Sequence, residues 1–144
     1  MTTTTIRPAR VMDAEAMARL LDILGYPSSA SDLPGRLAAL ARPDHAVLLA
    51  VDASETVVGL VGLHCFPAVH ASAPVGYITA LVTAPEARGH GVGRQLVEAA
   101  ERWALERGCR RLTVTSAERR EDAHAFYPAC GLPYTGRRFS KALT

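Results

Sequence analysis

The first third of the chain carries hydrophobic residues at helical spacing. Apolar residues recur on one face after Asp13, a residue that can cap a helix, and Gly25 followed by Pro27 would end that helix. The residues of this apolar face are Met17, Leu20, Leu21 and Leu24. A second, shorter helix is predicted after a cap at Ser31 or Asp32, so the segment between the two helices is a connecting loop.

From Ala46 the pattern changes to that of strands. The runs "AVLLAVD" and "TVVGLVGLHCF" are rich in β-branched residues and are separated by "ASE", which predicts an antiparallel hairpin. The run "GYITALVTA" predicts a further strand after the loop 67–75. With a first strand expected near Ile6, the middle of the chain is predicted to build a sheet.

The last third alternates helices and strands. The segment "VGRQLVEAAERWALERG" predicts a helix that Gly108 ends, with one buried stripe formed by Leu96, Val97, Ala100, Trp103 and Ala104. A strand "CRRLTVTS", a short helix "ERREDAHAFY" and a final strand "TGRRFSKAL" follow. The whole order predicts a mixed sheet flanked by helices, in which 77–116 form one right-handed crossover.

Length and composition narrow the classes of protein. A chain of 144 residues, 49% of them hydrophobic, suits one domain over 1–144. No apolar run is long enough to span a membrane and the N-terminus lacks the apolar run of a signal peptide, so we expect a soluble, cytoplasmic protein. The three cysteines, Cys65, Cys109 and Cys130, fit reduced and mostly buried thiols better than a disulfide framework.

Charge is unevenly distributed. Residues 1–84 contain five Arg and seven acidic residues, a net charge of −2, whereas 85–144 contain eleven Arg or Lys and seven acidic residues, a net charge of +4. This asymmetry fits either an uneven solvated surface or an anionic ligand held by the C-terminal half.

The basic half begins with the segment "RGHGVGR" at 88–94, which joins a predicted strand to a predicted helix. Unpaired N–H groups and the positive end of the helix dipole at such a junction favour a phosphate group. The dinucleotide fingerprint fails because position 94 is Arg where a third glycine is needed. The ATP-type phosphate loop fails because the chain contains no Gly-Lys pair.

The spacing that remains, Arg88-x-x-Gly91-x-Gly93 after "LVTAPEA", resembles the acetyl-CoA loop of the GNAT acetyltransferases. The later segment "AHAFYPACGL" is similar to a second region of that family, in the family order. The resemblance implies the α/β (α+β) GNAT fold: a mixed, mostly antiparallel central sheet flanked by helices, with two parallel strands splayed apart at the acetyl-CoA site.

The resemblance also implies a set of cofactor-binding residues. The pyrophosphate would lie against the turn formed by Arg88, Gly89, His90, Gly91, Val92, Gly93 and Arg94. The pantetheine arm would bond to the strand backbone at Leu81, Val82 and Thr83. A bulge in that strand, expected at Val82 or Thr83, would donate an N–H to the thioester carbonyl.

The implied reaction is direct attack by a neutral primary amine on the acetyl carbon. By its place in the motif, Tyr127 is the candidate acid for the departing thiolate. The base stays open, because "GYITALVTA" contains no carboxylate; His64, His124 or water are the alternatives. The five histidines show no spacing typical of metal ligands, so we expect no metal.

Several residues depart from the family pattern. Pro128 follows Tyr127 and predicts that the helix ends near Tyr127. Arg120 stands where the family often has Asn, Leu132 replaces the usual Phe, and Thr83 replaces an apolar residue.

The function predicted is an acetyl-CoA-dependent N-acetyltransferase that acts on a small-molecule or protein amine. A catalytically silent acyl-CoA sensor is the alternative, since no base is evident and Pro128 adjoins the acid. A nucleic-acid binder is supported only by the basic C-terminal half and lacks aromatic platforms on basic strands, so we expect no nucleic acid. We expect no membrane partner, and the resemblance makes a homodimer possible.

Overall fold

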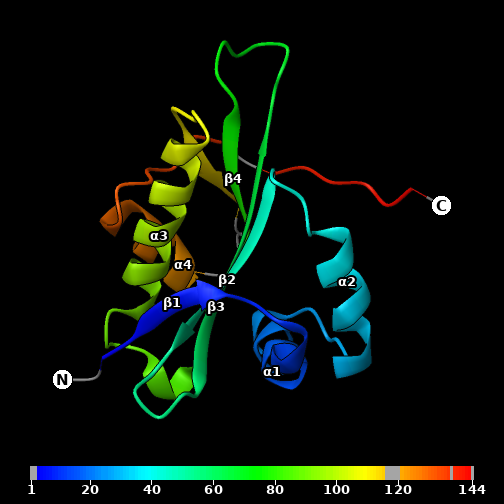
Figure 1. Ribbon diagram of the computed structural model, residues 1–144. Coiled ribbons are helices and arrows are strands. Elements are labelled where there is room, and N and C mark those ends of the chain that lie inside the picture. Colours follow the sequence, from blue (N-terminus) through cyan, green and yellow to red (C-terminus); the bar gives the residue numbers. More distant parts are fainter. Residues whose placement is uncertain (1–2, 116–120, 137, 144) are drawn as a thin grey trace.

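The computed structural model describes residues 3–115, 121–136 and 138–143. Its centre is a five-stranded sheet in the order β1-β2-β3-β4-β5 (Figure 1). The strands are β1 (Thr5–Pro8), β2 (His45–Val51), β3 (Val57–Phe66), β4 (Val75–Thr83) and β5 (Leu112–Val114). The first three pairings are antiparallel and the β4–β5 pairing is parallel, which confirms the predicted hairpin and the mixed sheet.

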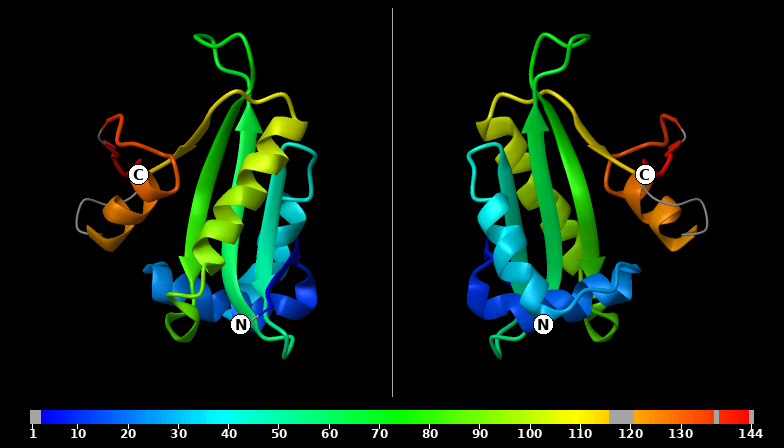
Figure 2. Two further views of the ribbon diagram at one scale, coloured as in Figure 1. Left: turned by 90° about the vertical axis from the view of Figure 1, so that its left-hand side faces the viewer. Right: turned by 90° about the vertical axis from the view of Figure 1, so that its right-hand side faces the viewer.

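Helices cover both faces of the sheet. The helices α1 (Ala14–Leu24) and α2 (Leu33–Ala39) lie on one face, and α3 (Val92–Glu106) lies across the other (Figures 1 and 2). The helix α4 (Glu121–Ala129) stands beyond β5, at the side of the sheet (Figure 2). Three short 3-10 helices complete the described elements: η1 (Val11–Asp13), η2 (Ala30–Asp32) and η3 (Pro85–Ala87).

The core is formed by the apolar stripes that the sequence predicts. Leucine side chains from α1, β2, β3 and α3 are fully buried there, namely Leu20, Leu49, Leu63 and Leu96. Trp103 is buried in the same cluster. A Cβ on Gly59 would lie 2.9 Å from Leu96 Cδ1, so this glycine lets α3 pack close to β3.

The three longest helices end in the same way. Gly25, Gly108 and Gly131 have positive φ values of 109°, 81° and 88° after α1, α3 and α4. At α4 the Leu132 N–H donates to the Tyr127 carbonyl at 2.9 Å and the Gly131 N–H donates to the Pro128 carbonyl at 3.0 Å. This is the Schellman arrangement, which satisfies the last carbonyl groups of a helix.

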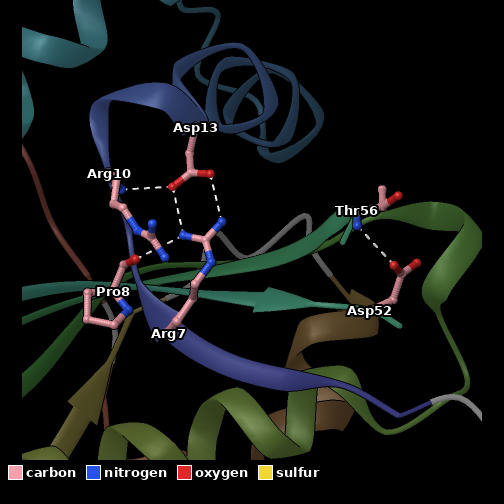
Figure 3. A network of polar contacts seen from close by, with 6 residues as sticks. All are labelled: Arg7, Pro8, Arg10, Asp13, Asp52 and Thr56. Atoms are coloured by element: carbon pink, nitrogen blue, oxygen red, sulfur yellow. Dashed lines mark hydrogen bonds and ion pairs between the residues drawn. The ribbon is translucent and has the colours of Figure 1, made fainter. Parts of the chain in front are cut away.

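A partly buried ion pair between Arg7 and Asp13 fixes the start of α1 against β1 (Figure 3). Asp13 is only 7% exposed and accepts two hydrogen bonds from the Arg7 guanidinium, at 2.8 and 2.9 Å. It also accepts the Arg10 N–H at 2.8 Å. The carboxylate therefore caps the turn that precedes α1, rather than α1 itself as the sequence predicted.

Two predictions about the C-terminal part are wrong. The described residues of "TGRRFSKAL" form no strand, and Phe139 and Leu143 are 88% and 92% exposed, so their apolar side chains gain no burial that would favour a strand. The helix α4 does not end at Tyr127 but continues to Ala129 with Pro128 inside it. Pro128 lies in the last turn, where the Schellman bonds hold the helix end together.

None of the helices in the described ranges combines the length and the apolar character needed to cross a bilayer.

Candidate active site

The strand β4 changes its pairing halfway along. Gly62 of β3 pairs with Ala80, but the next residue, Leu63, pairs with Ile78, so Thr79 is an extra residue on β4. This is a β-bulge. The bulge expected at Val82 or Thr83 therefore lies at Thr79 instead, because β4 resumes regular pairing with β3 from Ala80 to Thr83.

The parallel partner of β4 ends at the same point. In the described residues, pairing between β4 and β5 covers Gly76–Ile78 and stops with Ile78 opposite Val114. Figure 2 shows β5 running away from β4 towards α4. The predicted separation of the two strands is confirmed, and it begins at the bulge.

The end of β4 leads through the short helix η3 into the glycine turn. Gly89 and Gly91 have φ values of 83° and 78°, which other residues rarely adopt, and Gly91 is the N-cap of α3. The first helical bond runs from the Gln95 N–H to the Gly91 carbonyl at 3.0 Å. The N–H groups at the start of α3 therefore lie at the positive end of the helix dipole, without helical acceptors.

Gly93 is needed for a different reason. A Cβ at this position would lie 3.0 Å from Phe126 Cζ and 3.5 Å from Thr83 Oγ1. The missing side chain lets the ring of Phe126, on α4, pack against the first turn of α3. The glycines of "RGHGVGR" thus have two roles. Gly89 and Gly91 allow the backbone conformation of the turn, and Gly93 leaves room for α4 to pack against α3.

A cleft of about 390 Å³ opens between β4, the glycine turn, α1 and α4. Ten of the eleven predicted site residues line this cleft: Leu81, Val82, Thr83, Arg88, Gly89, Gly91, Val92, Gly93, Arg94 and Tyr127. His90 is exposed in the turn and is not among the lining residues.

Four further residues line the cleft that the sequence did not assign to it: Ile23, Leu24, Ala87 and Phe126. Leu24 belongs to the predicted apolar face of α1, so the sequence marked it as buried but not as part of a site. Phe126 directly precedes Tyr127 in the segment "AHAFYPACGL", and this adjacency could have marked Phe126 as a site residue.

Polar contacts hold the walls of the cleft in place. Arg94 donates to the Ala129 carbonyl at 3.2 Å and so links the start of α3 to the end of α4. Arg19 of α1 pairs with Glu86 of η3 at 2.9 Å, just before the glycine turn. Both contacts are exposed, so the Arg19–Glu86 ion pair contributes position more than stability.

Tyr127 reaches the cleft although Pro128 follows it. The residue is 8% exposed, and its ring lies edge-on to Phe126 with 5.5 Å between ring centroids. Because α4 continues past Pro128, the proline does not turn Tyr127 away from the cleft.

Of the two histidines considered as the base, the structure describes the side chain of His64 but not that of His124. His64, on β3, stacks on His45 with 4.1 Å between ring centroids, and its Nε2 lies 3.9 Å from Asp44 Oδ2. The hydrogen bond from His45 Nδ1 at 3.0 Å lowers the pKa of Asp44. The side chain of His124 and the position of Arg120 fall outside the described residues.

Asp44, His45 and His64 also offer metal-ligand atoms within 4.8 Å of one another. The two rings are nearly parallel, at 9°, whereas the lone pair of an imidazole nitrogen lies in its ring plane. The lone pairs therefore do not converge on a tetrahedral site without rotation of a ring. The absence of a metal stays a prediction.

None of the three cysteines is among the residues that line the cleft. Cys65 and Cys109 are buried, and burial raises the pKa of the Cys109 thiol and of the half-buried Cys130 thiol. A raised thiol pKa disfavours the nucleophilic thiolate.

Comparison with known proteins places the chain in a family. The profile of the acetyltransferase (GNAT) family matches residues 14–132. The chain is 36% identical to the aminoglycoside N(6')-acetyltransferase type 1 of Stenotrophomonas maltophilia, over 92% of this chain and 88% of that protein. It is 37% identical to the aminoalkylphosphonate N-acetyltransferase of Salmonella typhimurium, over 60% of this chain and 56% of that protein.

The fold matches as well. The structure of the aminoglycoside antibiotic 6'-N-acetyltransferase from Acinetobacter baumannii superposes with a TM-score of 0.84 at 20% identity, covering 99% of this chain and 100% of that one. The expected GNAT fold is confirmed. Both sequence relatives are acetyltransferases, which disfavours the silent sensor that the sequence left open. The chain therefore belongs to the GNAT family of acetyltransferases, and it is an N-acetyltransferase that takes its acetyl group from acetyl-CoA.

Proposed function

We propose that the acceptor is a small molecule with a primary amine. The observation that carries this proposal is the 36% identity, over 92% of the chain, to a protein named for acetylation of aminoglycosides. The second relative is named for aminoalkylphosphonates, which are also small amines. A protein amine has no comparable support from these two relatives.

In this proposal the cleft holds acetyl-CoA as the second substrate. The pyrophosphate lies against the N–H groups of the turn 88–94, with positive charge from Arg88 and Arg94. Leu81, Val82 and Thr83 contact the pantetheine arm where β4 has parted from β5. The bulge residue Thr79, left unpaired in the ladder, is the proposed N–H donor to the acetyl carbonyl.

The reaction needs an acid as well as a base. The amine nitrogen attacks the acetyl carbon, a C–N bond forms, and the C–S bond breaks. Tyr127 is the proposed proton donor to the departing sulfur, and its position in the cleft supports this role. No covalent acyl-enzyme is required.

A panel of amines tests the acceptor class. We expect free thiol release from acetyl-CoA with aminoglycosides or aminoalkylphosphonates at a higher kcat/KM than with lysine-containing peptides. A preference for the peptides would contradict the proposed acceptor. If no amine of the panel releases thiol from acetyl-CoA, the proposed class of acceptor is contradicted.

The proposal treats 1–144 as one acetyltransferase domain that assembles as a homodimer. Exposed apolar side chains at Val69, Phe139 and Leu143 are available to a second copy. Light scattering that gives the mass of one chain at working concentration would contradict the dimer and leave the acceptor class untouched.

A further inference from the structure

A row of ring side chains crosses the sheet next to the proposed thioester position. His45, His64 and Tyr77 lie directly opposite one another on β2, β3 and β4. Phe66 extends the row, with its ring centroid 5.0 Å from that of His64 and 6.4 Å from that of Tyr77.

The row lies on the face opposite α3. A Cβ on Gly76 would lie 3.1 Å from Ala104 of α3, so Gly76 faces that helix. Because neighbouring residues of a strand point to opposite faces, Tyr77 and its partner His64 point to the side of α1 and α2. The side chain of His64 is 31% exposed there, and it is not among the residues that line the cleft of about 390 Å³, so an acceptor would meet it from the side of α1 and α2.

The row also borders the bulge. Thr79 is two residues from Tyr77 on β4, and a Cβ on Gly62, two residues from His64, would lie 2.6 Å from Thr79 Oγ1. Gly62 and Thr79 therefore share the face of the ring row. The one pair between His64 and the bulge, Leu63 with Ile78, points to the other face.

The chemistry calls for a proton acceptor at this position. A primary ammonium with a pKa of about 10 cannot attack until it loses a proton. The strand β4 carries no carboxylate. Histidine is the side chain that ordinarily changes charge between about pH 5 and pH 8, so it is suited to take a proton near neutrality.

We propose that His64 accepts the proton that the acceptor ammonium loses, with Asp44 and His45 as positioning residues. The proton moves from the ammonium to the imidazole and leaves a neutral amine, whose nitrogen then attacks the acetyl carbon. The nitrogen loses its second proton to solvent as the C–N bond forms. Tyr127 donates one proton to the sulfur and regains one from solvent, and the imidazolium returns its proton to solvent.

The groups facing His64 favour this exchange. The Asp44 carboxylate lies 3.9 Å from its Nε2 and stabilises the imidazolium that forms. His45 stacks on the ring and holds Asp44 by its hydrogen bond, while Phe66 and Tyr77 are the other rings beside it. This inference rests on the proposed amine acceptor, since only a charged amine needs the step.

The test is the pH dependence of kcat, at saturating acetyl-CoA and in the presence of EDTA, for wild type, His64→Gln and Asp44→Asn. For wild type we expect a limb of the pH profile in which kcat rises with pH, as the proton acceptor loses its proton. His64→Gln should lower kcat at pH 7 by about 100-fold and abolish that limb, because general bases contribute factors of this order. Asp44→Asn should move the limb to lower pH, because the imidazolium loses its negative partner.

His70→Gln is the matched control, because His70 is an exposed histidine of the loop after β3. It should leave both kcat and the limb unchanged. An unchanged affinity for acetyl-CoA, measured by calorimetry, shows that each variant is folded.

A folded His64→Gln that keeps kcat within twofold and keeps the limb would overturn the proposal. If His64→Gln does not fold, an unmoved limb in Asp44→Asn would overturn it. Absence of wild-type turnover with every amine would instead contradict the proposed acceptor, so the two failures differ in the wild-type rate.

Discussion

At the scale of single residues, Gly93 shows how a motif glycine acts through packing. Its hypothetical Cβ meets the Phe126 ring at 3.0 Å, so Gly93→Ala should push the ring and with it Tyr127. Alanine favours the helix, so we expect stability to be kept while kcat falls on the order of ten-fold, because small displacements of catalytic groups are costly. The control is Gly35→Ala in α2, where a Cβ meets nothing within 4 Å. A variant Gly93→Ala with the wild-type kcat would show that the ring does not position Tyr127.

Tyr127 itself can be tested by removing its hydroxyl. Tyr127→Phe keeps the ring and its contact with Phe126, so the affinity for acetyl-CoA should stay unchanged. Thiol release should slow by about 100-fold if the hydroxyl is the acid. Tyr134→Phe, at an exposed tyrosine, is the control. Equal rates for wild type and Tyr127→Phe would reduce Tyr127 to a packing residue.

The ion pair of Asp13 makes a prediction about stability. The hydrogen bonds from Arg7 lower the pKa of Asp13, so its contribution is fully present above the ordinary carboxyl pKa of about 3.9. Asp13→Asn should therefore lower the free energy of unfolding by about 2 kcal/mol at pH 7. Urea denaturation should show this difference shrinking as the pH falls through the lowered pKa. A difference that is the same at pH 7 and at about pH 2, or one equal to that of the exposed Asp22→Asn, would contradict this role.

At the scale of elements, α4 depends on its attachment to α3. Arg94→Ala removes the bond to the Ala129 carbonyl and should open α4 more often. A loss of about 1 kcal/mol corresponds to roughly five-fold faster amide hydrogen exchange in the region of α4. Arg88→Ala, in the same turn, should leave this exchange rate unchanged. Equal protection in both variants would mean that the bond does not hold α4.

The elements also show what a sequence can and cannot predict. The hairpin β2–β3 and the stripe of α3 follow from hydrophobic period, because one face of each must be buried. The bulge at Thr79 could not be predicted, since no glycine or proline in that part of β4 marks it. The false final strand and the helix continuing past Pro128 depend on burial and tertiary contacts, which local propensity does not contain.

At the scale of the whole molecule, the site is assembled from segments far apart in the chain. The turn 88–94 was predictable because its glycines, its arginines and its place before a helix all lie within a few residues. The grouping of Asp44, His45 and His64 depends instead on the register of β2 against β3, and the two histidines are paired there. Periodicity predicts that two strands pair but not which residues stand opposite.

The central claim is that the glycine turn binds acetyl-CoA, and calorimetric titration of wild type and Gly91→Asp tests it most directly. We expect wild type to bind, and Gly91→Asp to bind on the order of 100-fold more weakly, because a side chain and a negative charge meet the pyrophosphate. Gly108→Asp is the matched control, since Gly108 has a similar φ of 81° and open space at the other end of α3. Equal affinity of wild type and Gly91→Asp would contradict the account.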